Sequence, residues 1–171
     1  MLKRLFVIIL ALVLICFQLG LVDQLGYGLA WLNLPLVSLV FVLNAFSINI
    51  AWFWLLAVGL PLELLSFHPF GLIIGLLAII LLADQLLLKH WLTDRSAYTL
   101  LILTLVSVLL YELGFWLGDY LLTGGYLSIN DLAWNILLPK LGANLALAAV
   151  LLIFNNAINH RFRPVFLEKL K

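Results

Sequence analysis

The sequence predicts an all-α integral membrane protein, a six-transmembrane-helix bundle in one domain spanning 1–171. Hydrophobic residues make up 66% of the chain and charged residues 10%, whereas a soluble domain has about 25% charged residues. The apolar residues also gather in six long runs with short breaks between them, and about 20 apolar residues are enough to cross a bilayer. A chain with so little polar surface must have lipid as its solvent.

The first three predicted spans lie at about 4–22, 30–47 and 49–66. The first follows basic residues as a signal peptide does, but no small-x-small cleavage site comes after its apolar run. We therefore expect an uncleaved helix that ends at Asp23. The second and third spans have only residues 47–49 between them, so we expect a tight helical hairpin.

The last three spans are predicted at about 70–88, 97–118 and 134–158, and a basic cytoplasmic tail follows at 159–171. The tail mixes basic residues with Phe, Val and Leu. It either fixes the topology of the chain or binds the membrane interface or a partner. Asp84 lies one turn before the end of the fourth span, and we expect it in the membrane interface.

The basic residues predict that both termini are cytoplasmic. Six crossings put eight of the nine Lys and Arg residues on one side: Lys3, Arg4, Lys89, Arg95, Arg161, Arg163, Lys169 and Lys171. The loops predicted on the other side contain no Lys or Arg, as the positive-inside rule requires of an inner-membrane protein. Four or five crossings would break this pattern.

Polar residues inside the spans are the functional candidates, because an ionisable group in lipid is costly unless it is paired. Glu112 and Lys140 lie at similar depth in consecutive antiparallel spans, so we predict an ion pair; the alternative is that Lys140 snorkels outward. Asn144 follows Lys140 by one helical turn. Together with Gln18 and Glu63, these side chains are expected to converge below the outer surface. They form either a ligand pocket or partner groove, or polar contacts that hold helices together.

Pairs of small residues spaced by four permit close helix contacts within the bundle or toward a partner: Gly71/Gly75, Gly114/Gly118 and Gly142/Ala146. The sequence is compatible with a homo-oligomer and with a monomer.

Other classes of function have little support in the sequence. A net charge of +1 gives no bulk attraction to nucleic acid. His and Cys residues show no metal-ligand spacing, and no nucleophile motif is present, so we expect no enzyme, no metal site and no cofactor. The single Cys16 lies inside an apolar run and is expected to behave as a small buried hydrophobe.

Two stretches, LPLVSLVFVLNAF at 34–46 and the run at 52–96, resemble the rod shape-determining membrane protein MreD family. Pro35 matches the Pro of a family Pro-Asp pair, although Leu36 replaces the Asp. A second motif matches at Gly59, Glu63, Leu64 and Ser66, with Glu63 in place of Asp. A turn motif matches at Pro69, Phe70, Gly71 and Leu72. Gln18 stands where the family often has a Gln.

The resemblance implies a non-catalytic scaffold in the inner membrane of a bacterium, acting with the cell-wall elongation machinery. Its implied partners are a single-span periplasmic protein like MreC, the elongation-complex proteins that synthesise peptidoglycan, and membrane lipid. The implied fold is similar to the substrate-binding subunits of energy-coupling-factor transporters. The alternative is therefore a vitamin-binding subunit with an outward pocket.

For the scaffold, we expect the hairpin that carries Pro35 and the turn near Glu63, Pro69 and Gly71 to shape a groove for a partner's transmembrane helix. The polar residues Gln18, Glu112, Lys140 and Asn144 complete this candidate groove.

Overall fold

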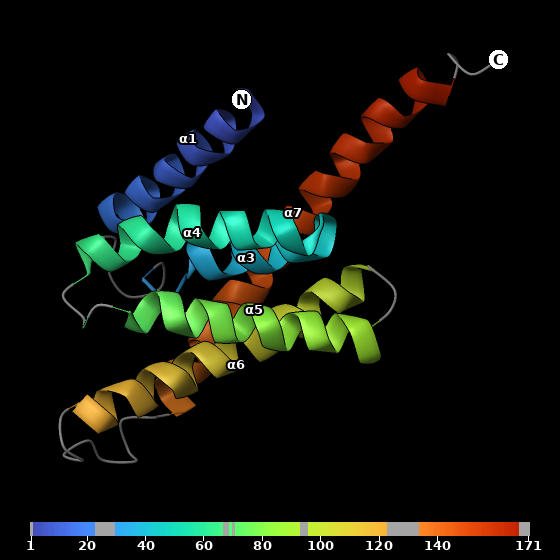
Figure 1. The fold of residues 1–171 in the computed structure, drawn as a ribbon. Helices are drawn as coiled ribbons and strands as arrows, with labels where there is room; N and C mark the ends of the chain where they lie inside the picture. Colours follow the sequence, from blue (N-terminus) through green and yellow to red (C-terminus); the bar gives the residue numbers. More distant parts are fainter. Residues whose placement is uncertain are drawn as a thin grey trace.

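The computed structural model is a bundle of helices (Figure 1). It describes residues 2–22, 30–66, 69, 71–92, 96–122 and 134–167, and these contain no strand. Side chains at the helix ends before Ile9 and after Ile153 are outside this description. The helices in chain order are α1 (Leu2–Phe17), its π-helical continuation η1 (Gln18–Val22), α3 (Leu34–Ala45), α4 (Ile48–Leu65), α5 (Leu72–His90), α6 (Ala97–Leu122) and α7 (Trp134–Leu167).

Four helices are long and apolar enough to cross a membrane: α4, α5, most of α6 and the first half of α7. This makes the chain a multi-pass membrane protein. The apolar parts of α1, at Ile9–Gly20, and of α3, at Leu34–Ala45, are shorter. The predicted bundle of apolar helices is therefore present, and four of its six predicted spans have the length of a membrane helix.

The helices alternate in direction, so their ends gather at two opposite ends of the bundle (Figure 1). At one end, which we call the Glu63 end, α4 and α6 finish and α5 and α7 begin. At the other, which we call the Ser47 end, α3 passes into α4 and α5 finishes before α6 begins. The predicted hairpin of α3 and α4 is present, with Ser47 in extended conformation at its turn.

Helix α3 lies at the centre of the bundle and contacts α1, α4, α5, α6 and α7. Most of its residues are buried, because it is apolar on every side. Its 12 residues span about 18 Å, which is less than the roughly 30 Å hydrocarbon core of a bilayer. Five other helices pack against it, although Ala45 at its last position and Phe46 after it are exposed.

The start of α3 differs from the prediction of a span from residue 30. The Asn33 side chain accepts a hydrogen bond from the Leu36 backbone N–H at 3.1 Å and so caps the helix. Pro35 follows in the first turn, where its missing N–H costs nothing. Residues 30–33 are consequently not helical, and their backbone groups need other partners.

The α5–α6 contact is close because of two glycines in α6. A Cβ added to Gly114 would lie 2.4 Å from Leu76, and one added to Gly118 would lie 2.9 Å from Leu72. The other two small-residue pairs differ, since a Cβ at Gly71, Gly75 or Gly142 meets nothing within 4 Å. Among the three predicted pairs, Gly114/Gly118 is therefore the one that packs tightly inside the bundle.

Helix α7 extends beyond its predicted end at 158 and reaches Leu167, so the first part of the predicted tail is helical. The side chains of the basic tail and of Lys3 and Arg4 are not described, and the loops at 23–29 and 123–133 and residue Arg95 lie outside the described residues. Cys16 is exposed on the surface of the bundle rather than buried. It lies on α1 among the exposed residues Leu12, Val13 and Phe17.

Candidate functional site

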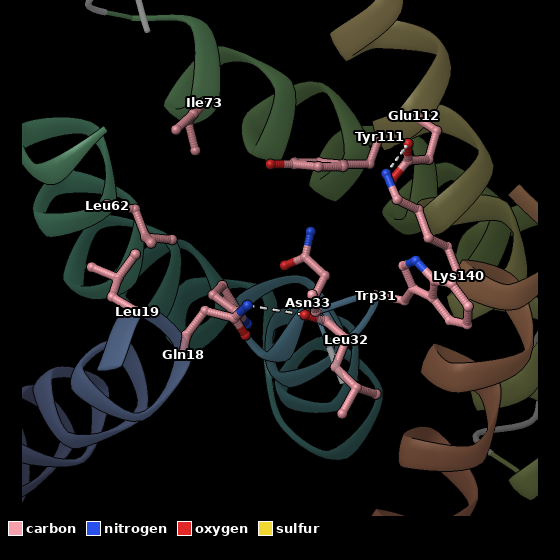
Figure 2. A pocket seen from close by; sticks show the side chains of 12 residues that line it. Gln18, Leu19, Trp31, Leu32, Asn33, Leu62, Ile73, Tyr111, Glu112 and Lys140 are labelled. Atoms are coloured by element: carbon pink, nitrogen blue, oxygen red, sulfur yellow. Dashed lines mark hydrogen bonds and ion pairs between the residues drawn. The ribbon is translucent and has the colours of Figure 1, made fainter. Parts of the chain in front are cut away.

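A cavity of about 220 Å³ lies at the Glu63 end, where η1 and the helices α3 to α7 contribute to its wall (Figure 2). Figure 2 shows the side chains of Asn33 and Tyr111 pointing into the space, with the Glu112–Lys140 pair at its edge. The full lining is Gln18, Leu19, Ala30, Trp31, Leu32, Asn33, Pro35, Leu62, Ile73, Tyr111, Glu112 and Lys140. We refer to it below as the polar cavity.

Gln18 holds the chain just before α3 against η1. Its Nε2 donates to the Leu32 carbonyl at 3.0 Å, and its Oε1 accepts from the Leu34 backbone N–H at 3.1 Å. The side chain is buried. It stands at the first residue of the π-helical segment η1, and such segments are frequent at functional sites. Gln18 thus supplies both a donor and an acceptor to backbone that has no helical partner.

Asn144 of α7 performs the same task from the opposite side. Its Oδ1 accepts from the Asn33 backbone N–H at 2.8 Å, and its Nδ2 donates to the Trp31 carbonyl at 3.0 Å. The Nδ2 also donates to the Lys140 carbonyl one turn earlier, at 2.8 Å. The side chain is 1% exposed. It lies behind the cavity wall and supports it without lining it.

Glu112 and Lys140 form the predicted ion pair between α6 and α7. Lys140 Nζ donates to Glu112 Oε1 at 2.9 Å and to Oε2 at 2.7 Å. Both side chains are partly exposed, at 23% for Glu112 and 28% for Lys140. The pair neutralises the two charges at the cavity edge, so an entering group meets a dipole there and no isolated charge.

Glu63 does not line the polar cavity. Its Oε1 accepts from the Gly71 backbone N–H at 2.7 Å, and its Oε2 accepts from the Ile74 N–H at 2.8 Å. The buried carboxylate therefore caps the first turn of α5, where the helix dipole also favours a negative charge. Gly71 has φ +99°, a left-handed conformation that glycine adopts without strain. The Pro69 carbonyl accepts from the Leu72 N–H at 3.2 Å.

The eight predicted site residues thus divide into three groups. Gln18, Pro35, Glu112 and Lys140 line the polar cavity, Asn144 supports its wall, and Glu63, Pro69 and Gly71 build the start of α5. The sequence interpretation missed Trp31, Asn33 and Tyr111 as cavity residues. The Asn33-x-Pro35 spacing was an available sign, because a cap followed by proline marks a helix start and leaves the preceding backbone non-helical.

Asp84 corrects a second expectation. It does not face the surroundings of the bundle as an interfacial carboxylate would, because its side chain is 1% exposed and packs between α5 and α6. Its Oδ2 lies 2.6 Å from Ser107 Oγ. Its Oδ1 is buried without a hydrogen-bond partner in the described part of the chain. Asp84 is far from the polar cavity, whose lining does not include it.

The polar side chains around the cavity are mainly bonded to other parts of the bundle. Gln18 and Asn144 bond to backbone, and Glu112 bonds to Lys140. Among the residues that the structure describes, no three His, Cys, Asp or Glu side chains gather as a metal site would require. The arrangement can therefore bind a group by shape and by neutral hydrogen bonds.

Comparisons with known proteins leave the family open: no family model, no curated protein and no solved structure matches this chain.

Proposed function

We propose that this chain is a non-catalytic membrane scaffold of the cell-wall elongation machinery, similar to the MreD family. In this proposal it lies in the cytoplasmic (inner) membrane of a bacterium with the Glu63 end outward. Its partner is a single-span periplasmic protein like MreC, which inserts side chains into the polar cavity. The function is to hold this partner beside the elongation-complex proteins that synthesise peptidoglycan.

The support from sequence is the resemblance at 34–46 and 52–96, together with the positive-inside pattern that places the Glu63 end outward. The support from structure is that polar side chains of the cavity lining already bond within the bundle. Its ion pair is closed, and its amide side chains bond to backbone. A lining whose ion pair and Gln18 amide already have partners suits recognition by shape.

The single observation that carries the proposal is the size of the polar cavity. Pockets that enclose a small molecule have volumes of roughly 300–1,000 Å³, and this one has about 220 Å³. It would hold about seven waters at ~30 Å³ each. That space accommodates one or two side chains of a partner helix better than a whole vitamin.

The second candidate is the substrate-binding subunit of an energy-coupling-factor transporter. The observation that favours it is the position of the cavity, open at one end of the bundle and faced by the polar side chains of Asn33 and Tyr111 (Figure 2). A vitamin-sized ligand would require the cavity to widen, and the Glu112–Lys140 pair would have to open to bind a charged group.

Site-specific photo-crosslinking in native membranes tests both candidates. A photoreactive phenylalanine analogue at Leu62 would face the cavity, whereas the same analogue at Leu60 of α4 is a matched control on the exposed surface. The scaffold predicts that position 62 captures a single-span periplasmic protein and that position 60 does not. A small-molecule adduct at position 62 would favour the transporter subunit.

Filling the cavity gives a second test. Leu62→Trp should reduce co-purification of the partner at least tenfold, while Leu60→Trp should leave it unchanged. Unchanged recovery with Leu62→Trp, in a protein with normal thermal stability, would contradict the proposed binding place. Glu63 and Pro69 are poor choices for this test because they build the start of α5.

A further inference from the structure

Asp84 is a buried carboxyl group that the proposed function does not use. It lies six residues before the end of α5, in a helix that is long and apolar enough to cross a membrane, and faces Ser107 of α6. The buried residues that flank the two side chains along their helices are apolar except for Thr104, whose hydroxyl donates to the Leu100 carbonyl at 2.8 Å; the apolar ones are Ile80, Leu81, Leu103 and Val108. A carboxyl group in such surroundings is costly when it is ionised unless a cation or several donors balance the charge.

No cation is placed to balance it within the described residues. Helix α3 carries no titratable side chain, and the Glu63 carboxylate of α4 is bound ten residues away, at Ile74, about 15 Å along α5. On α5 itself, Lys89 and His90 are exposed in the last turn. The described titratable groups of α6 are Tyr98, Tyr111, Glu112 and Tyr120, none of them a cation, and Glu112 is paired with Lys140.

The hydrogen bonds of Ser107 indicate whether the Asp84 carboxyl group is protonated. Ser107 Oγ lies 2.6 Å from Asp84 Oδ2 and 2.7 Å from the Leu103 carbonyl. A hydroxyl has one hydrogen to donate, and serines in membrane helices commonly donate it to the carbonyl four residues earlier. The Leu103 carbonyl can only accept. If Ser107 donates to it, the hydrogen in the short contact with Asp84 must come from Asp84.

We propose that Asp84 is an intramembrane proton-binding site, and that in this arrangement of helices it is a neutral carboxylic acid. The acid donates from Oδ2 to Ser107 Oγ, and Ser107 donates to the Leu103 carbonyl. Release of the proton would leave a carboxylate with one donor at most and a bare Oδ1. Helices α5 and α6 would then have to separate at this level to admit water or a cation.

Infrared spectroscopy of the purified protein in lipid tests the proposal, because a neutral carboxylic acid has a carbonyl stretching band that a carboxylate lacks. We expect this band at neutral pH in the wild type and its loss in Asp84→Asn. Ser107→Ala should keep the band and move it to higher frequency, because the acid loses its acceptor. Asn can donate to Ser107 as the acid does, so Asp84→Asn should keep the thermal stability of the wild type.

Equal spectra for the wild type and Asp84→Asn would overturn the proposal, since Asp84 would then be ionised. If Asp84→Asn does not fold, the same question can be answered by comparing the infrared spectra of unlabelled wild-type protein and wild-type protein with ¹³C-labelled aspartate. An acid band that shifts on labelling supports a protonated aspartate, and an acid band that does not shift, or its absence, overturns it. At high pH we expect the band to disappear together with faster amide hydrogen exchange in α5 and α6.

Discussion

Single polar side chains hold this bundle together by bonding to backbone. Gln18 and Asn144 satisfy the non-helical residues before α3, and Glu63 satisfies the first turn of α5. Lipid offers no hydrogen bonds, so an unsatisfied backbone group costs several kcal/mol within the membrane. The sequence predicted that these residues point inward, but their backbone partners depend on where each helix begins, which the sequence shows only weakly.

Glu63 can be tested as a helix cap. We expect Glu63→Ala to lower the free energy of unfolding by about 2 kcal/mol, because two backbone N–H groups lose their acceptor. Glu63→Gln should cost about half as much, because the amide oxygen can still accept one of the two bonds. Thermal unfolding in mild detergent measures both. The neighbouring Leu64 is 73% exposed, and Leu64→Ala is the control that should leave stability unchanged; equal stability of Glu63→Ala and the wild type would contradict the cap.

The Glu112–Lys140 pair can be measured with a double-mutant cycle. We expect Glu112→Ala and Lys140→Ala each to destabilise the bundle, because each leaves one charge without its partner in a membrane setting. The double variant should be more stable than the sum of the two losses indicates, with a coupling free energy of about 1 kcal/mol. Additive losses would show that the contact contributes nothing.

At the level of helices, the close packing of α5 against α6 depends on two glycines. Gly114 and Gly118 bring the α6 backbone close to the side chains of Leu76 and Leu72. The sequence offered three small-residue pairs with equal spacing and did not distinguish among them. What distinguishes them is the direction in which each pair faces, and that is a property of the assembled bundle.

Substitution by alanine compares two of these glycines directly. Gly114→Ala places a methyl group against Leu76, so we expect a loss of about 1–2 kcal/mol from overpacking. Gly75→Ala in α5 meets open space and should change stability by less than about 0.5 kcal/mol. Thermal unfolding of the two variants makes the comparison. Adding Leu76→Ala to Gly114→Ala should recover part of the lost stability. If it recovers none, the loss does not come from the contact between residue 114 and Leu76.

For the whole molecule, apolar run length predicted the class and the α4–α5–α6–α7 series well. It failed at the start of α3, because an apolar run does not show where a capping residue such as Asn33 begins the helix. The polar cavity was predicted only in part. Gln18, Glu112 and Lys140 were identifiable as charges or amides in lipid, whereas Tyr111 and Trp31 look in the sequence like any other apolar or interfacial aromatic residue.

For the whole molecule, we predict that α4 crosses the membrane with its Ser66 end outward and its Ser47 end toward the cytoplasm. Ser47 and Ser66 flank α4 at its two ends, and its 18 residues span about 27 Å. In a background without Cys16, we expect Ser66→Cys to react with a membrane-impermeant thiol reagent in intact spheroplasts. Ser47→Cys should react only after permeabilisation. Labelling of both residues from the same side would contradict α4 as a span and the positive-inside assignment.

The hydrogen bonds of Asn144 have a consequence for how the chain is made. They join residues separated by 111 and 113 positions, so the groups at Trp31 and Asn33 leave the ribosome long before α7. During synthesis these backbone groups have no Asn144 to bond with, although Gln18 is already present to hold Leu32 and Leu34. The bundle can therefore finish folding only when its last helix inserts. A chain that stops before α7 leaves the Asn33 N–H and the Trp31 carbonyl without their Asn144 partner.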